Sequence, residues 1–292
     1  MKNIGEFDPK TNKFPYPIDT DKHYIILKKD RGIKFDANYP YVDKSKGFRF
    51  KRFWIRLIIT LIVFPMTKIR LGLKVCGKKN LKKNKKLIKE GVITVSNHIH
   101  MWDYLAIMRT VRHYNWPYVL VWNKNVNDKQ GKNVRMVGGI PIPDDLSGTK
   151  KYLSDVKELL NSGNILHLYA EGSMWEYYKP IRPFKLGAFK LADQFDKPVI
   201  PIGFSYRRPG FIRRKIFKQI ACLTINVGEP LFINKDLNKH DRITDLANRC
   251  HDEVCKLSGI KQEDNLYEKI YNNSKRIDYY TDSYGEGYKG SK

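Results

Sequence analysis

Residues 92–103 read VITVSNHIHMWD, an apolar run followed at once by a polar turn. The first half, Val92 to Ser96, is rich in β-branched residues and predicts a buried strand. The second half carries two histidines and an aspartate. An apolar strand that ends in such a turn is typical of a sheet whose strands lead into helices, so this stretch indicates both the fold class and the place to look for a site.

His98 and Asp103 are close enough in sequence to interact in one arrangement. Five positions along a continuous helix correspond to a rotation of about 140°, so the two side chains would face different ways on one helix. They can meet if His98 lies in the turn after the strand and Asp103 begins the next helix. The carboxylate would then orient the imidazole as a general base. The alternative is a histidine that only stabilises the turn.

Strand-like runs and helical patterns alternate along the rest of the chain from Gly91. Helices are predicted over Lys150–Leu160, Phe184–Phe195 and Asp241–Leu257, where apolar residues recur at helical spacing. The alternation predicts a layered α/β domain with a mixed, mostly parallel sheet flanked by helices, with sites at the carboxyl ends of the strands. Further strands are expected over Tyr118–Trp122, Gly139–Ile142, Ile165–Tyr169, Pro198–Phe204 and Leu223–Val227.

The charge of the chain predicts a polyanionic partner. Its 292 residues include 55 Lys and Arg against 30 Asp and Glu, a net charge of +25 at pH 7, which suits nucleic acid or an anionic membrane surface. Hydrophobic residues make up 41%, enough for a substantial core, so a wholly disordered basic protein is excluded. The four cysteines form no C-x-x-C pair, which argues against a zinc ribbon or disulfide framework and favours a reducing compartment.

One segment is a membrane candidate. Phe53 to Phe64 is almost wholly apolar between basic flanks, but a dozen helical residues span only about 18 Å, short of the ~30 Å hydrocarbon core. A helix lying in or dipping into one leaflet is therefore favoured over a span, and a buried core helix is the third alternative. The basic run Lys78–Lys89 follows closely, and Met1 to Ile18 lacks the apolar region of a secretory signal.

Two further blocks follow predicted strands. Glu171, after the strand ending at Tyr169, can accept hydrogen bonds from a substrate or pin a loop, and Gly172 permits close backbone approach. Three cations downstream, Lys179, Arg182 and Lys185, place positive charge nearby. Paired glycines at 138 and 139 lead into another strand, and prolines interrupt the run 198–202.

In order, these blocks read N-H-x(4)-D, G-x-I-x-I, E-G-S, P-F-K-x-G-A-F and P-V-I-P-I. The series resembles that of the glycerolipid acyltransferase superfamily, which includes the 1-acylglycerol-3-phosphate acyltransferases, from roughly Phe53 to Leu231. The resemblance implies acyl transfer from an acyl carrier protein or coenzyme A thioester to a lipid hydroxyl, with His98 as general base, Asp103 orienting it, no metal and no other cofactor. The substrate-binding candidates are Asn97, Gly139, Ile140, Glu171, Gly172, Ser173, Lys179, Arg182, Lys185 and Pro201.

The chain departs from the family pattern at two places. Members that bind a glycerol phosphate commonly carry an arginine after the G-x-I block and another after E-G-[ST], where this chain has Pro143, Asp144 and Asp145, and then Met174. An aspartate or methionine cannot supply the bidentate fork that holds phosphate. Either a downstream cation substitutes and the acceptor is 1-acylglycerol-3-phosphate, which we favour, or the acceptor is a different lipid.

Two other function classes compete. His98, His100 and Asp103 form H-x-H-x-x-D, which could hold zinc in a hydrolase, but His167 is expected inside a buried strand and further ligands are missing. A nucleic-acid binder would suit the charge, yet no helix-turn-helix, zinc-finger or RNP pattern is present.

We therefore expect a membrane-associated acyltransferase of phospholipid biosynthesis, peripheral or monotopic on the cytoplasmic face of the cell membrane. Its partners would be an anionic membrane surface, a lysolipid and the acyl carrier, and no nucleic acid. The expected division is an irregular extension over 1–50, a membrane-associating helix and basic segment over 51–90, the acyltransferase domain over 91–262 and a polar, flexible tail over 263–292.

Overall fold

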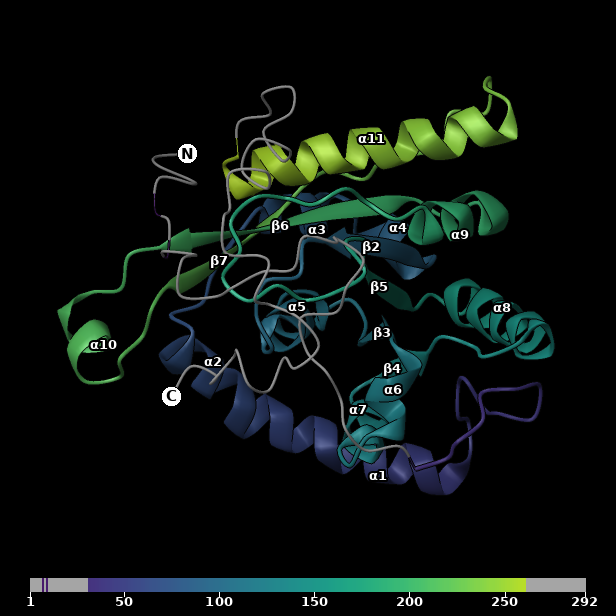
Figure 1. Ribbon diagram of the computed structural model, residues 1–292, viewed down its shortest axis with the longest axis horizontal. Coiled ribbons are helices and arrows are strands. Elements are labelled where there is room, and N and C mark those ends of the chain that lie inside the picture. Colours follow the sequence, from purple (N-terminus) through teal and green to yellow (C-terminus); the bar gives the residue numbers. More distant parts are fainter. Residues whose placement is uncertain (1–6, 8, 10–30, 261–292) are drawn as a thin grey trace, which may run out of the picture.

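The computed structural model describes residues 7, 9 and 31–260, and the tail expected over 263–292 lies outside these residues. In the described part the strands form one sheet in the order β1-β7-β6-β2-β5-β3-β4 (Figure 1). The strands are β1 (Lys74–Cys76), β2 (Val92–Ser96), β3 (Pro117–Val121), β4 (Gly139–Pro141), β5 (Ile165–Tyr169), β6 (Val199–Arg207) and β7 (Cys222–Val227).

The sheet is mixed and mostly parallel, as the sequence predicts. Only β6 and β7 pair antiparallel within the described sheet. The strand at the centre, β2, lies between β5 and β6, and all of its residues are buried. A parallel strand covered on both faces has the continuous apolar character that VITVS shows. The turn after β2 therefore emerges at the carboxyl edge of the sheet, beside the end of β5.

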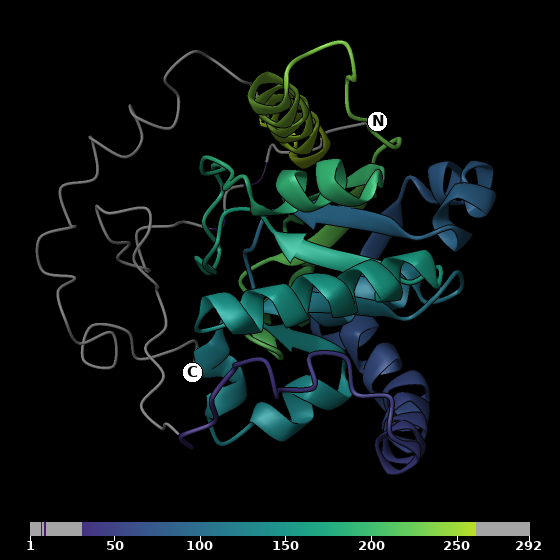
Figure 2. The same ribbon diagram turned by 90° about the vertical axis from the view of Figure 1, so that its right-hand side faces the viewer.

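Helices cover both faces of this sheet. On one face α8, α9 and α11 pack side chains such as Val156, Phe189 and Leu246 against β2 and β5, and Figure 2 shows these three helices one above another. On the other face α3, α4 and α5 contribute Leu81, Ile88 and others. The helices are α1 (Lys46–Ile58), the π-helix η2 (Ile59–Val63), α2 (Phe64–Arg70), α3 (Lys78–Lys83), α4 (Lys85–Lys89), α5 (Asp103–Val111), α6 (Asn123–Asn127), α7 (Gly131–Met136), α8 (Leu146–Asn161), α9 (Gly187–Phe195), α10 (Phe211–Lys215) and α11 (Lys239–Ser258).

The predicted strands agree with the structure to within three residues at each end, and β2 and β5 agree at both ends. All three predicted helix starts differ from the structure, and the start predicted at Asp241 is the nearest, because α11 begins at Lys239 after its cap Asn238. The helix predicted from Lys150 begins at Leu146 because Asp145 caps it, and the one predicted from Phe184 begins at Gly187 because the backbone N–H of Lys185 donates to the carbonyl of Ala170. No pattern in the sequence predicts β1, whose three residues pair with β7.

The apolar segment is part of a longer continuous helix, α1-η2-α2, over residues 46–70. Among the residues that the structure describes, no helix has both the length and the apolar character needed to cross a membrane. The alternative of a buried core helix is wrong, because this helix exposes Phe50, Phe53, Trp54, Leu57, Ile58, Leu61, Ile62, Met66 and Ile69. Its buried side chains are Arg52, Ile59, Phe64 and Thr67, so most of its apolar side chains point outward.

Candidate active site

His98 and Asp103 meet in the turn between β2 and α5. Asp103 is the first residue of α5, and its Oδ2 lies 2.7 Å from His98 Nδ1. The same oxygen accepts the backbone N–H of Ile99 at 3.2 Å and of His100 at 3.4 Å, which folds the turn around the carboxylate. The arrangement is the one that the sequence spacing allows. It gives a histidine with one ring nitrogen on a carboxylate and the other, Nε2, available to a substrate.

Tyr169, which sequence reasoning did not single out, completes this group. Its hydroxyl donates to Asp103 Oδ1 at 2.6 Å, and its ring stacks on the His98 imidazole with centroids 3.7 Å apart. Burial raises the pKa of Asp103, but the charge and hydrogen bond of His98 and the hydrogen bond of Tyr169 outweigh burial, so its pKa is lower than usual. Burial, and then the Asp103 charge, raise the pKa of Tyr169 well above its usual value. The carboxylate is therefore held ionised between two donors.

Glu171 and Arg182 form a buried pair behind the turn. Glu171 Oε2 accepts the backbone N–H of His98 at 3.1 Å and a hydrogen bond from Arg182 Nη2 at 3.2 Å, while Oε1 accepts the backbone N–H of Arg182 at 2.9 Å. Arg182 Nη1 also donates to Ser173 Oγ at 3.0 Å. Both charged side chains are at most 4% exposed. In this structure Glu171 pins the loop that carries His98 to the loop that follows β5.

The other substrate-binding candidates divide into two sets. Asn97 is 1% exposed and uses its amide on the backbone of Phe204 in β6, with Oδ1 accepting from the N–H at 2.9 Å. Pro201 lies inside β6 in register with Val95, and neither it nor Lys179 lines the cavity beside His98. Gly139 and Ile140 are buried in β4. The candidates that do line this cavity are Gly172, Ser173 and Lys185.

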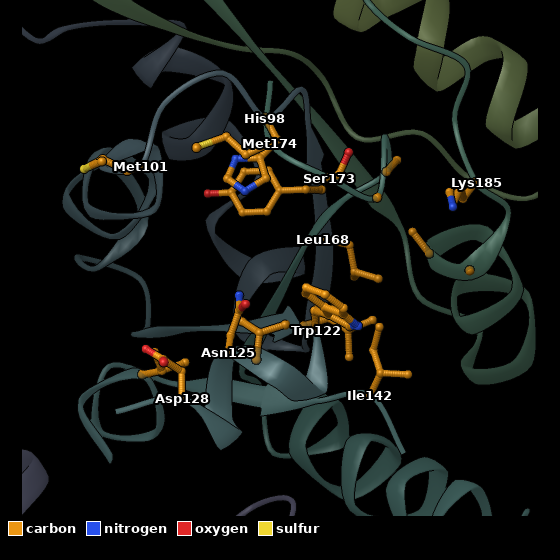
Figure 3. Close-up of a pocket in the computed structure, with 18 of the residues that line it drawn as sticks. His98, Met101, Trp122, Asn125, Asp128, Ile142, Leu168, Ser173, Met174 and Lys185 are labelled. Atoms are coloured by element: carbon orange, nitrogen blue, oxygen red, sulfur yellow. The ribbon is translucent and has the colours of Figure 1, made fainter. Parts of the chain in front are cut away.

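The cavity beside His98 has a volume of about 580 Å³. Figure 3 shows His98 and Met174 at one end and Trp122 and Ile142 at the other, with Lys185 at the side. Its walls come from the ends of β3 and β5, the loop after β5, the α6–α7 region and the start of α9. The apolar residues in them include Leu120, Val121, Trp122, Val134, Ile142, Leu168 and Ala188. An imidazole at the mouth of an apolar cavity can act on the polar end of a long apolar substrate.

The acidic pair at 144 and 145, where the family carries a phosphate-binding arginine, has structural partners. Asp144 Oδ2 accepts the backbone N–H of Phe35 at 2.9 Å, and its Oδ1 accepts from Asn123 Nδ2 at 2.6 Å. Asp145 Oδ1 accepts the backbone N–H of Gly148 at 2.6 Å and caps α8. Asp144 therefore attaches the chain around residue 35 to the β4–α8 turn, and Asp145 fixes the start of α8.

The ring nitrogens of the other histidines of this region, His167 and His100, form hydrogen bonds within the protein. His167 lies fully buried in β5 with Nδ1 2.9 Å from Thr94 Oγ1 and Nε2 3.3 Å from Ser96 Oγ, and burial lowers its pKa to about 3. His100 Nδ1 accepts the backbone N–H of Trp102 at 3.1 Å, and burial lowers the pKa of His100 to about 4. Within residues 7, 9 and 31–260, no three His, Cys, Asp or Glu side chains gather as metal ligands.

Comparison with known proteins gives a family for the core of the chain. Residues 72–205 match the family model described as acyltransferase. Among solved structures, the crystal structure of the 1-acyl-sn-glycerophosphate (LPA) acyltransferase PlsC from Thermotoga maritima is similar, with 14% identity, a TM-score of 0.46, and coverage of 78% of this chain and 93% of that chain. No curated protein matches the chain.

Proposed function

Because residues 72–205 form a domain of the acyltransferase family, which makes the chain an acyltransferase, we propose that it moves a fatty acyl group from an acyl carrier protein or coenzyme A thioester to a lysophospholipid hydroxyl. The acceptor we propose is 1-acylglycerol-3-phosphate, which would give phosphatidic acid. The observation that carries the proposal is the His98 and Asp103 pair, 2.7 Å apart, at the mouth of the apolar cavity.

The geometry supports a direct transfer. His98 Nε2 removes the proton of the acceptor hydroxyl while its Nδ1–H stays hydrogen-bonded to Asp103. The deprotonated oxygen of the acceptor then attacks the thioester carbonyl. The C–S bond of the tetrahedral intermediate then breaks, and the leaving thiolate takes the proton from the imidazolium. The apolar walls below His98 would hold the acyl chain.

Lys185 is the cation we assign to the acceptor phosphate. It is the only Lys or Arg among the described residues that line the cavity, and it lies beside Gly172, where an added Cβ would come within 2.8 Å of Lys185 Cε. Of the other two candidate cations, Arg182 is paired with Glu171 in the interior and Lys179 does not line the cavity.

The outward apolar face of α1-η2-α2 supports docking on the cytoplasmic face of an anionic bilayer. A second exposed apolar group, Phe211 and Ile212 on α10 and Ile216 and Phe217 just after it, adjoins its end, because Arg213 donates to the backbone carbonyls of Lys68 and Ile69. Lys68 and Arg70 on α2, and Arg214 and Lys215 on α10, place positive charge beside these apolar side chains.

The test offers labelled acyl thioester, on either carrier, to the purified protein with a panel of lysolipids that do or do not carry a phosphate. We expect transfer to the phosphorylated acceptor and its loss in His98→Ala, with the fold and vesicle binding retained. Transfer by His98→Ala at the wild-type rate would overturn the mechanism.

A second candidate acceptor, a lipid without a terminal phosphate, is favoured by one observation. The positions where the family holds phosphate-binding arginines carry Asp144, which is bonded to Phe35 and Asn123, and Met174, which lines the cavity. Transfer to the unphosphorylated members of the panel alone would select this acceptor.

A further inference from the structure

A second cavity, of about 690 Å³, lies between α1 and the C-terminal end of α8. We name it the arginine pocket, after the lining residues Arg49, Arg52 and Arg56; Lys44, Tyr118 and Asn164 also line it. Tyr118 is near the start of β3, and Asn164 directly precedes β5. Because β2, β3 and β5 run parallel, this cavity is at the amino edge of the sheet, opposite the carboxyl edge where His98 lies.

Arg52 is the central group of the arginine pocket. It is only 6% exposed, and Nη1 donates to the Tyr118 hydroxyl at 2.6 Å while the guanidinium lies 4.3 Å from the Tyr118 ring centroid. Its Nε and Nη2 have no hydrogen-bond partner among the described residues. These two nitrogens share one edge of the guanidinium plane, so together they present the fork that binds a carboxylate or phosphate side-on.

The groups around Arg52 add further positive charge, and none of those that the structure describes forms an ion pair with Arg52. Arg56, one turn further along α1, stacks on Trp116 at 4.8 Å, and burial and the nearby Arg52 lower its pKa to about 10. The lining includes two carboxylates, Asp43 and Glu158, and Glu158 pairs with Lys44. A buried arginine that lacks a counter-charge costs folding free energy, and an anion that enters the pocket would recover it.

The neighbouring surface indicates what carries that anion. Phe53 lines the arginine pocket, is 60% exposed, and belongs to the outward apolar face of α1. A ligand that places phosphate on Arg52 can therefore lay acyl chains along the adjoining apolar side chains. We propose that the arginine pocket binds the phosphate of an anionic membrane lipid, at a site separate from the acyl-transfer centre. The choice of a lipid over free phosphate rests on the membrane docking in the proposed function.

The test compares binding to phosphatidylcholine vesicles that contain either phosphatidic acid or oleic acid at matched surface charge, without acyl donor. The control is Lys51→Gln, which removes one charge at an exposed position of α1 outside the lining of the pocket. We expect the wild type and this control to bind vesicles with phosphatidic acid about tenfold more tightly than vesicles with oleic acid. Arg52→Gln and the exposed Arg49→Gln should lose that preference. Arg49→Gln keeps the test decisive if Arg52→Gln does not fold.

Equal binding to both vesicles by the wild type, or an unchanged preference in the two arginine variants, would overturn the proposal. Thermal stabilisation of the wild type by inorganic phosphate that matches the effect of phosphatidic acid vesicles would assign the pocket to a soluble phosphate and overturn the lipid assignment. Since no acyl donor is present, failure here leaves the acyl-transfer proposal intact, and an inactive enzyme would leave the vesicle result intact.

Discussion

The Tyr169 hydroxyl donates to Asp103 Oδ1 at 2.6 Å, while His98 uses the other oxygen of the same carboxylate at 2.7 Å. Both rings come from the carboxyl edge of the sheet, where Ser96 of β2 and Tyr169 of β5 stand in register. Asp103 is 1% exposed, so these donors, with the two backbone N–H groups of the turn, replace its hydration. The strength of the hydrogen bond between His98 and Asp103 should therefore depend on how strongly Tyr169 competes for the carboxylate.

Tyr169→Phe tests that dependence. The variant removes one charge-assisted hydrogen bond and keeps the stacked ring, so Asp103 becomes a stronger acceptor for the Nδ1–H of His98. The acid limb of the profile of kcat/KM against pH should move to higher pH, with the plateau rate lowered by about tenfold. The measurement is the full pH profile. An unmoved acid limb with only lower stability would make Tyr169 a packing residue.

Asp103→Asn should lower the rate by about 10³- to 10⁴-fold, the scale seen when the carboxylate beside a catalytic histidine is neutralised. The amide can place its NH₂ toward the Tyr169 oxygen and its carbonyl toward His98, so the turn is retained while the charge that stabilises the imidazolium is lost. Single-turnover transfer rates give the effect. A rate within tenfold of wild type would show that Asp103 does not support catalysis.

Asp103→Asn should also change how the unfolding free energy depends on pH. The pKa of Asp103 is lower in the folded protein than in the unfolded chain, so its ionised form stabilises the fold above the unfolded-chain pKa, and this contribution is lost as pH falls toward the folded-state pKa. Asp103→Asn lacks a titrating group at this position. Its loss of stability between those two pKa values should be shallower than that of the wild type in urea titrations.

The contact between His98 and Asp103 could be predicted from sequence, because one local arrangement of strand, turn and helix brings them together. The strands β2 and β5 could also be predicted, since each is a mainly apolar run that starts after Gly91 or Asn164 and has a polar residue within two positions of its end. The partnership of Tyr169 with Asp103 could not be, because it depends on the register between β2 and β5. Alternation along β5 places His167 and Tyr169 on the same face of the sheet, which was the available signal.

The burial of Arg182 could not be predicted from the sequence either. Residues 170–186 have no helical or strand periodicity, so nothing in their pattern distinguishes a cation facing substrate from one paired inside. Asp144 is similar, because its partners Phe35 and Asn123 are far from it in the chain, whereas Asp145 makes the local cap of α8. Contacts made through irregular segments depend on tertiary packing, which the hydrophobic periodicity of the sequence does not predict.

Arg182→Met distinguishes an interior role from substrate binding. Removing the guanidinium leaves the Glu171 carboxylate buried without its ion-pair partner, which should cost about 3–5 kcal/mol of unfolding free energy. Urea denaturation measures the cost. The double variant Arg182→Met with Glu171→Gln should regain part of it, since no buried charge remains. A loss below about 1 kcal/mol with a raised KM for the acceptor would instead assign Arg182 to substrate.

Trp122→Ala tests the end of the cavity away from His98. The indole lies among the apolar walls at that end, so its removal lengthens the space available to an acyl chain (Figure 3). Each methylene that gains an apolar contact is worth about 0.8 kcal/mol, so the ratio of kcat/KM for successively longer acyl donors should rise about fourfold per added methylene until the new space is filled. Competition between acyl donors of different length measures the ratio directly.

Lys190→Ala, on the exposed side of α9 and outside the cavity, is the matched control and should leave the preference unchanged. If both variants keep the wild-type preference, the acyl chain does not occupy this cavity.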